Sequence, residues 1–170
     1  MKKMGLSILL VFILLSGCSN PITNPIKGNT IIDWADFVKW DGKSYTRLRE
    51  AVIREPNDIT DEVVGEVTFK VGDVVTNPNY RTKDGDAAFL DIGTKLYKVK
   101  GFSENKLIAA KDNRRIGGYR LYAEKKEFET LNLHYNDVPK HKVERIELFH
   151  SGDTTAFRTL TDMEKETFIQ

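Results

Sequence analysis

The sequence predicts a mainly β fold: an antiparallel sheet curled into a barrel or a sandwich, with one or two short helices. Two observations favour this class. Short runs in which apolar and polar residues alternate recur along the chain, which is typical of half-buried strands. Turn-forming residues such as Asp41-Gly42 and Ser151-Gly152-Asp153 separate these runs. Strands divided by such turns favour a sheet of about eight short strands.

The first predicted element is a hairpin around Asp41-Gly42. An Asp-Gly pair favours a type I′ turn, because both central residues need a positive φ. The pair lies between two extended runs, at 36–40 and 43–48. A two-residue turn between them places Val38 opposite Tyr45.

Further elements are expected between residues 60 and 124. Thr60-Asp61-Glu62 is expected to open one helical turn that ends at Gly65. A regular alternation over 63–71 then indicates a strand. The remaining predicted strands cover 87–90, 94–100, 107–111 and 118–124, and the last two form a hairpin with Asp112-Asn113-Arg114-Arg115 at its tip.

The last part of the chain contains a polar stretch and a second hairpin. Residues 136–140 are the candidate internal boundary of the domain. Strands at 143–150 and 155–160 flank the turn at 151–153. Thr161 and Glu164 have the spacing of a capping box, so a helix is expected to start near Asp162.

The amino terminus has the pattern of an export signal. Lys2 and Lys3 precede an apolar run from Leu6 to Leu15. Ten residues at about 1.5 Å each are too short to cross a ~30 Å hydrocarbon core, so the run is typical of a signal peptide. Leu15-Ser16-Gly17-Cys18 follows, and this motif resembles the lipobox of bacterial lipoproteins.

That resemblance implies cleavage between Gly17 and Cys18 and a diacylglyceryl group on Cys18, the only cysteine of the chain. Two acyl chains hold a protein stably on a membrane, whereas one holds it only marginally. The expected organisation is a signal peptide at 1–17, a lipidated cysteine with a flexible tether at 18–29, and a single domain at 30–170. The expected location is the outer face of the cell membrane, as a lipid-anchored protein.

Charge argues against a nucleic-acid partner. Without Lys2 and Lys3 the chain holds 24 basic and 25 acidic residues, which is close to neutral and contains no long basic run. With Cys18 lipidated, no thiol remains for a disulfide or a thiolate metal site. No cofactor and no metal ligand set is predicted.

No motif for catalysis stands out. His134, His141 and His150 lack the spacing of helix-borne metal ligands. Asp84-Gly85-Asp86 fails the twelve-residue calcium-loop pattern and reads as a polar turn. No serine lies in a Gly-x-Ser-x-Gly elbow. An enzyme therefore stays a minor alternative.

The candidate binding residues are Lys111, Arg114, Arg115 and Arg120, the most concentrated basic feature of the chain. Such a cluster suits anionic lipid headgroups, a wall polymer or an acidic partner, and it is also compatible with a solvated hairpin tip. Trp34 and Trp40 are expected in the core at this strand spacing.

Two further resemblances bear on function. The residues Gly-Asp-Ala-Ala-Phe-Leu at 85–90, Gly-Thr-Lys-Leu-Tyr at 93–97 and Gly101 resemble a pattern in small uncharacterised lipoproteins of Bacillus-type bacteria, which implies a Gram-positive cell surface. The architecture is also similar to that of lantibiotic immunity lipoproteins. The expected function is therefore a lipid-anchored extracytoplasmic binding or interaction module with a peptide or protein partner. An immunity-type lipoprotein that sequesters a membrane-active peptide is the alternative.

Overall fold

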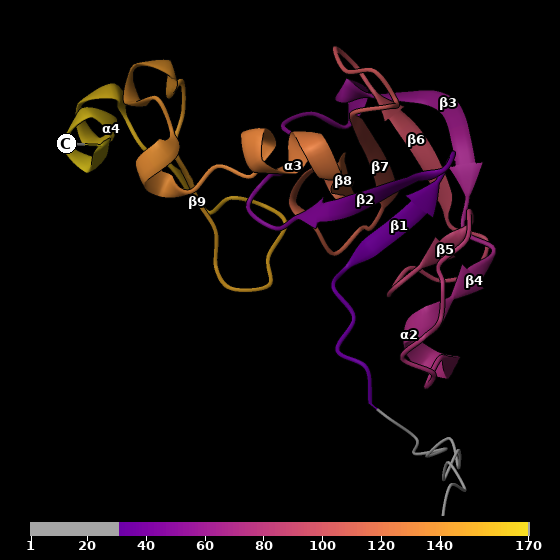
Figure 1. The fold of residues 1–170 in the computed structure, drawn as a ribbon. Coiled ribbons are helices and arrows are strands. Elements are labelled where there is room, and N and C mark those ends of the chain that lie inside the picture. Colours follow the sequence, from indigo (N-terminus) through magenta and orange to yellow (C-terminus); the bar gives the residue numbers. More distant parts are fainter. Residues whose placement is uncertain (1–30, 170) are drawn as a thin grey trace, which may run out of the picture.

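A strongly curled half-barrel forms the body of the molecule (Figure 1). The computed structural model describes residues 31–169, so the expected signal peptide, Cys18 and the tether at 18–29 lie outside the described residues and remain predictions. The eight strands of the sheet follow the order β3-β6-β7-β8-β2-β1-β5-β4. All neighbouring pairs are antiparallel except β4 and β5, which are parallel. The predicted mainly β, curled antiparallel fold is confirmed.

The strands of this sheet are short. Their bounds are β1 Phe37–Trp40, β2 Lys43–Leu48, β3 Ile59–Glu66, β4 Phe69–Lys70, β5 Asp86–Ala87, β6 Lys95–Val99, β7 Leu107–Lys111 and β8 Tyr119–Glu124. The helices among them are α2 Val71–Val74 and α3 Lys125–Leu131, with 3-10 turns η1 Pro56–Asp58 and η2 Ile116–Gly118.

The hairpin of β1 and β2 has the predicted turn and register. Asp41 and Gly42 both adopt positive φ, 47° and 68°, as a type I′ turn requires. Val38 faces Tyr45 across the two strands. The Gly42 N–H donates to both carboxylate oxygens of Asp84, at 2.9 and 3.0 Å, which fastens the turn to a loop 42 residues further along the chain.

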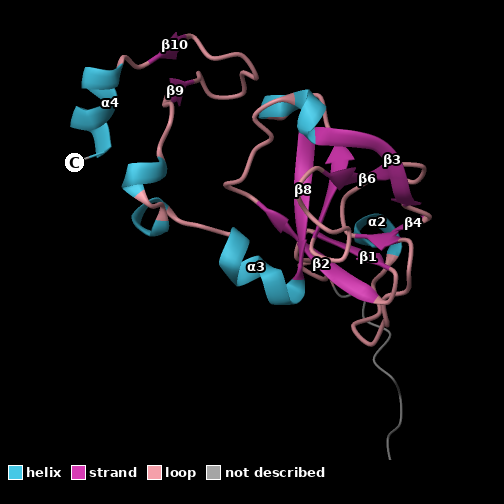
Figure 2. Cartoon of the chain, turned by 90° about the horizontal axis from the view of Figure 1, so that it is seen from above, coloured by secondary structure: helices cyan, strands magenta, loops and turns pink. Residues whose placement is uncertain are grey.

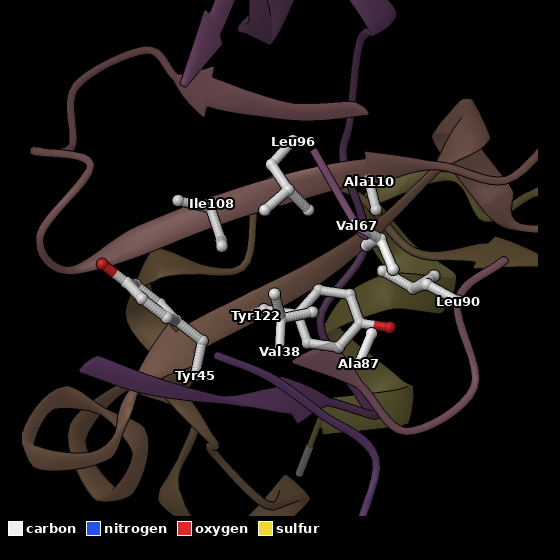
Figure 3. Close-up of a cluster of buried hydrophobic side chains, with 9 residues drawn as sticks. All are labelled: Val38, Tyr45, Val67, Ala87, Leu90, Leu96, Ile108, Ala110 and Tyr122. Atoms are coloured by element: carbon white, nitrogen blue, oxygen red, sulfur yellow. The ribbon is translucent and has the colours of Figure 1, made fainter. Parts of the chain in front are cut away.

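Two apolar clusters lie on the two faces of the sheet. The inner cluster fills the curl, and Figure 3 shows its side chains, which are Val38, Tyr45, Val67, Ala87, Leu90, Leu96, Ile108, Ala110 and Tyr122. The outer cluster lies under α3 and is formed by Leu48, Ile53, Ile59, Val99, Leu107, Ala109, Leu121 and Ala123. Neighbouring residues of one strand alternate between the clusters, as a pleated strand requires.

Both tryptophans pack against the core, as expected. Trp40 packs against the inner cluster and crosses Gly65, where a Cβ atom would lie 2.6 Å from the indole Cε2. Trp34 packs beside Phe37, with ring centroids 5.8 Å apart. Neither ring forms an exposed aromatic platform.

One local prediction between residues 60 and 71 is wrong, and another holds only in part. The alternation over 63–71 is not one strand, because β3 ends at Glu66 and β4 covers only Phe69–Lys70 before helix α2 begins at Val71. The stretch Thr60-Asp61-Glu62 belongs to strand β3 and opens no helical turn. Pairing of β3 with β6 outweighs its weak helical signal, and the ladder is irregular between Ile59 and Gly65. Helix α3 was not predicted. It begins after Glu124, whose side chain accepts a hydrogen bond from the Lys126 N–H at 2.8 Å.

A carboxy-terminal extension leaves the half-barrel after α3 (Figure 2). It contains the 3-10 turns η3 Tyr135–Asp137 and η4 Lys140–Lys142, the strand pair β9 Glu147–Leu148 and β10 Arg158–Thr159, and helix α4 Asp162–Ile169. The second hairpin is confirmed only in part, because its strands are two residues each and not the predicted 143–150 and 155–160. The capping box is confirmed: Glu164 accepts from the Thr161 N–H at 3.0 Å, and its own N–H donates to the Thr161 hydroxyl at 3.4 Å. No side chain of residues 132–169 is buried.

Candidate functional site

The hairpin of β7 and β8 forms the predicted basic feature. The two strands pair from Leu107 with Ala123 to Lys111 with Tyr119, so the hairpin is confirmed. Two turns fold its tip, because the Arg115 N–H donates to the Asp112 carbonyl and the Gly118 N–H to the Arg115 carbonyl, at 3.0 and 2.8 Å.

Gly117 holds the tip against the segment that follows β2. Its φ of 73° lies in the left-handed region that favours glycine. A Cβ atom there would also collide with the carbonyl oxygen of Ile53. The tip is therefore packed against a neighbouring segment.

A nearly buried carboxylate, Asp112, organises the charges at the base of the tip. Its Oδ1 accepts from the N–H and the Nε of Arg114 at 3.1 and 3.0 Å, and its Oδ2 accepts from Arg120 Nε at 2.6 Å. Burial by itself would raise the pKa of Asp112. The hydrogen bonds from Arg114 and Arg120 outweigh burial and lower that pKa to about 2. Asp112 is therefore ionised at neutral pH.

A second buried carboxylate, Asp36, extends this network toward the amino-terminal segment. Asp36 Oδ1 accepts from the Tyr122 hydroxyl at 3.1 Å, and Oδ2 accepts from Arg47 Nη1 at 3.2 Å. Arg120 Nη1 lies 3.9 Å from the same Oδ2. Burial, followed by the charge of Asp36, raises the pKa of Tyr122, so this hydroxyl stays protonated and donates.

The network places the tip close to the point where the chain enters the barrel. Arg120 bridges Asp112 and Asp36, and Asp36 lies five residues after Ile31, the first described residue. In Figure 1 the segment that precedes the barrel joins the amino-terminal end of β1.

The four predicted binding residues fall into different environments. Arg120 is only 15% exposed and is neutralised by two carboxylates, so it belongs to the interior network rather than to the surface. Arg114 is 81% exposed, although its Nε is bound to Asp112. Lys111 is exposed and Arg115 half-buried, and within residues 31–169 neither side chain has a hydrogen-bond or ion-pair partner.

Sequence reasoning missed Lys95, another unpaired cation that lies beside Lys111. Leu96 faces Ala110 across β6 and β7, so the antiparallel register brings Lys95 opposite Lys111. Like charges directly opposite one another are destabilising, which favours an anion between them. Glu66 faces Lys95 from β3, but no ion pair joins these two among the described residues.

We call Lys95, Lys111 and Arg115 the basic edge. An open depression of about 420 Å³ lies at two of its members, lined by Gly93, Thr94, Lys95, Tyr97, Lys111 and Asn113. Tyr97 packs edge-on against Tyr119, with ring centroids 6.2 Å apart. The depression thus has two ammonium groups, an amide side chain and a supported aromatic ring, a set that suits an anionic group.

The other polar candidates bind groups of the protein itself. Asp84 holds Gly42, and the buried Asp86 accepts from the Tyr80 hydroxyl and the Lys83 N–H, both at 2.8 Å. His150 stacks on Phe157 with ring centroids 4.2 Å apart. Among residues 31–169, no three His, Cys, Asp or Glu side chains gather in a way that would hold a metal ion.

Comparison with known proteins adds no relative. No protein-family description, curated protein or solved structure matches the chain. Within the described residues, no helix has both the length and the apolar character needed to cross a bilayer.

Proposed function

We propose that the chain is a lipid-anchored extracytoplasmic binding module that contacts anionic groups through its basic edge. The observation that carries the proposal is the basic edge itself. Three cations have no partner in the described part of the chain: Lys95 is the first residue of β6, Lys111 is the last residue of β7, and Arg115 lies in the turn between β7 and β8. Cations that the protein leaves unneutralised are available to an external anion.

The proposed lipid anchor on Cys18 supports contact between the basic edge and anionic lipids. Cys18 precedes Asp36 by eighteen residues, a length that reaches at most about 65 Å when fully extended. The Arg120 bridge from Asp36 to Asp112 places the hairpin tip near the entry of the chain. A diacylglyceryl group on Cys18 would therefore hold the same end of the barrel within reach of the membrane.

Electrostatics gives the expected size of the effect. Near an anionic surface each basic residue contributes about 1 kcal/mol, and the interaction decays within a Debye length of roughly 10 Å at 0.1 M salt. The basic edge also disfavours the immunity-type alternative, because it would repel a cationic membrane-active peptide.

Vesicle binding tests the proposal. A chain that begins at Ser19, and so lacks the lipid, should bind vesicles of phosphatidylglycerol and phosphatidylcholine. Lys111→Gln with Arg115→Gln should weaken this binding about ten- to thirty-fold at low salt, because two contributions of about 1 kcal/mol are removed.

A matched control removes two charges elsewhere. Lys125 and Lys126 are exposed lysines of α3 whose ammonium groups have no partner within the described residues. Lys125→Gln with Lys126→Gln should leave vesicle binding within about two-fold of the unaltered chain. Equal weakening by both double variants would show that net charge matters and that the basic edge does not.

A further inference from the structure

A hollow of about 470 Å³ lies between the half-barrel and the carboxy-terminal extension (Figure 2). The segment 52–54, which follows β2, and Ile116 of the hairpin tip form its barrel wall. Residues 142–145, Glu147 and Phe149 form the wall on the extension. We call this hollow the extension cleft.

Both walls of the extension cleft offer apolar side chains. On the barrel wall Ile53 is buried, Ile116 is half-buried and Val52 is 52% exposed. On the extension, Val143 and Phe149 are half-buried. A ligand with an apolar body would cover the exposed part of these side chains, which favours binding. The volume lies in the range of small-molecule sites, about 300–1,000 Å³.

Each carboxylate that lines the cleft has a guanidinium partner. Glu144 Oε2 lies 2.6 Å from Arg54 Nη1, and this ion pair joins the extension to the barrel. Glu147 Oε1 lies 2.9 Å from Arg145 Nε. Among residues 31–169 no other acidic side chain lines the cleft. The negative charges of its lining are therefore paired.

One cation of the cleft is left over. The ammonium group of Lys142 has no partner within the described residues. Three cations and two carboxylates line the cleft, which leaves one positive charge in excess. Arg54 and Arg145 also keep free N–H donors, because a guanidinium has five of them. A carboxylate carries the single negative charge that matches this excess, whereas a phosphate monoester carries about −1.5 to −2.

A ligand that touches both walls would also hold the extension on the barrel. Residues 132–169 contain no buried side chain. Helix α4 has eight residues, whereas an isolated helix needs about 12–15 to be even marginally stable in water. The position of the extension therefore depends on contacts such as the ion pair between Arg54 and Glu144. A ligand that binds only the docked arrangement stabilises it.

We propose that the extension cleft binds an organic carboxylate with an aromatic or branched apolar body, and that the bound acid fastens the extension to the barrel. The carboxylate lies at Lys142, and the apolar body lies between Ile116 and Val143, one from each wall. This binding is independent of the proposed function, because none of the three cations of the basic edge lines the cleft.

Photolabelling of the full chain tests the proposal. The protein is held in nanodiscs of phosphatidylcholine and irradiated with benzoate that carries a trifluoromethyl diazirine at its para position. Mass spectrometry should place the label on peptides that contain 52–54, 116 or 142–149. Unlabelled 4-tert-butylbenzoate should compete at least ten-fold better than 4-tert-butylbenzylamine, which has the same body and the opposite charge. Acetate, which has the charge without the body, should compete at least ten-fold more weakly.

Two variants separate the apolar body of the ligand from its charge. Val143→Phe puts a ring into the cleft and should lower labelling there about ten-fold, with circular dichroism as the check on folding. Lys142→Met keeps an apolar stem and removes the excess charge, so labelling should fall three- to ten-fold. Lys125→Met removes an exposed charge on α3, outside the cleft, and should change nothing.

Hydrogen exchange tests whether the acid fastens the extension. Saturation with 4-tert-butylbenzoate should slow amide exchange over residues 142–149 at least three-fold. Exchange in the hairpin of β1 and β2, which does not line the cleft, should stay the same. Unchanged exchange over 142–149 in protein that is labelled in the cleft would contradict the fastening of the extension.

Several labelling results would overturn the proposal. Label spread evenly over the chain, or confined to peptides of the basic edge, would show that the cleft holds no acid. Equal competition by the amine, or equal effects of Lys142→Met and Lys125→Met, would show that the cleft does not select a carboxylate. If Val143→Phe disorders the extension, the amine competition and the lysine variants still decide.

Discussion

Arg120 Nε lies 2.6 Å from Asp112 Oδ2, while Nη1 of the same guanidinium lies 3.9 Å from Asp36 Oδ2. One half-buried cation therefore joins the base of the hairpin tip to the segment that enters β1. Removing one partner of a buried charged pair leaves the other uncompensated, which is strongly destabilising. This bridge determines where the exposed cations of the tip stand relative to the entering chain.

Stability should depend on pH through Asp112. The folded-state pKa of about 2 lies below the ordinary value of 3.8, so the stabilisation is fully present above about pH 4. It is lost as pH falls from about 4 toward 2. Asp112→Asn should lower the free energy of unfolding by roughly 2 kcal/mol at pH 7, and the difference should shrink toward pH 2.

Urea unfolding of both proteins at pH 7 and near pH 2.5 measures this difference. If the two proteins differ in free energy of unfolding by the same amount at both pH values, the ionised Asp112 carboxylate does not stabilise the fold. A loss that appeared instead between pH 5 and 7 would point to another group.

The Tyr122 hydroxyl should contribute to stability through Asp36. Tyr122→Phe removes a buried donor to a carboxylate and should cost about 2 kcal/mol, because hydrogen bonds to charged groups exceed those between neutral groups. Tyr119→Phe is the matched control on the same strand, since the Tyr119 hydroxyl has no partner in the described part of the chain. Chemical denaturation measures the free energy of unfolding of both variants. Similar small decreases in the two would contradict a stabilising hydrogen bond from Tyr122 to Asp36.

Alanine substitutions at two adjacent glycines distinguish the cost of backbone strain from the cost of a steric clash. Gly117 and Gly118 have φ of 73° and 80°, so alanine is strained at both positions by about 1 kcal/mol. Only at position 117 does a Cβ atom meet the Ile53 carbonyl, whereas nothing lies within 4 Å at position 118. Gly117→Ala should therefore lower the melting temperature by several degrees more than Gly118→Ala. Equal losses would mean that the tip does not pack on residue 53.

Elements with a complete local signal could be predicted from the sequence. Asp41-Gly42 carries its own turn preference, and Thr161 with Glu164 carries its own cap, so both appear where they were expected. Helix α3 lacks an ordinary cap, because Glu124 takes that position. Only the spacing of Phe128 and Leu131, which both pack on the outer cluster, signals its apolar face.

The site depends on long-range register, which a single sequence does not reveal. Lys95 joins the basic edge because β6 and β7 pair so that it faces Lys111. The Arg120 side chain points into the curl of the sheet, where it lies close to Asp36, a residue 84 positions earlier in the chain. Local patterns therefore located the hairpin and its cations, while the pairing of distant strands decided which cations are unpaired.

The anchor itself has a direct chemical test. Cys18→Ala removes the sulfur atom that we propose carries a diacylglyceryl group, so metabolic labelling with a palmitate analogue should disappear. The variant should either keep its signal peptide or leave the membrane after aberrant cleavage. Equal labelling of both proteins would exclude Cys18 as the lipidated residue.

Crosslinking in intact membranes tests the central claim most directly, because it reports which end of the domain faces the lipid. A photoreactive benzoylphenylalanine replaces Asn113, an exposed residue of the hairpin tip, or Ser103, an exposed residue in the turn at the other end of β7. The proposed function predicts that irradiation attaches lipid at position 113 at least several-fold more than at position 103. Equal lipid attachment at the two positions would contradict it.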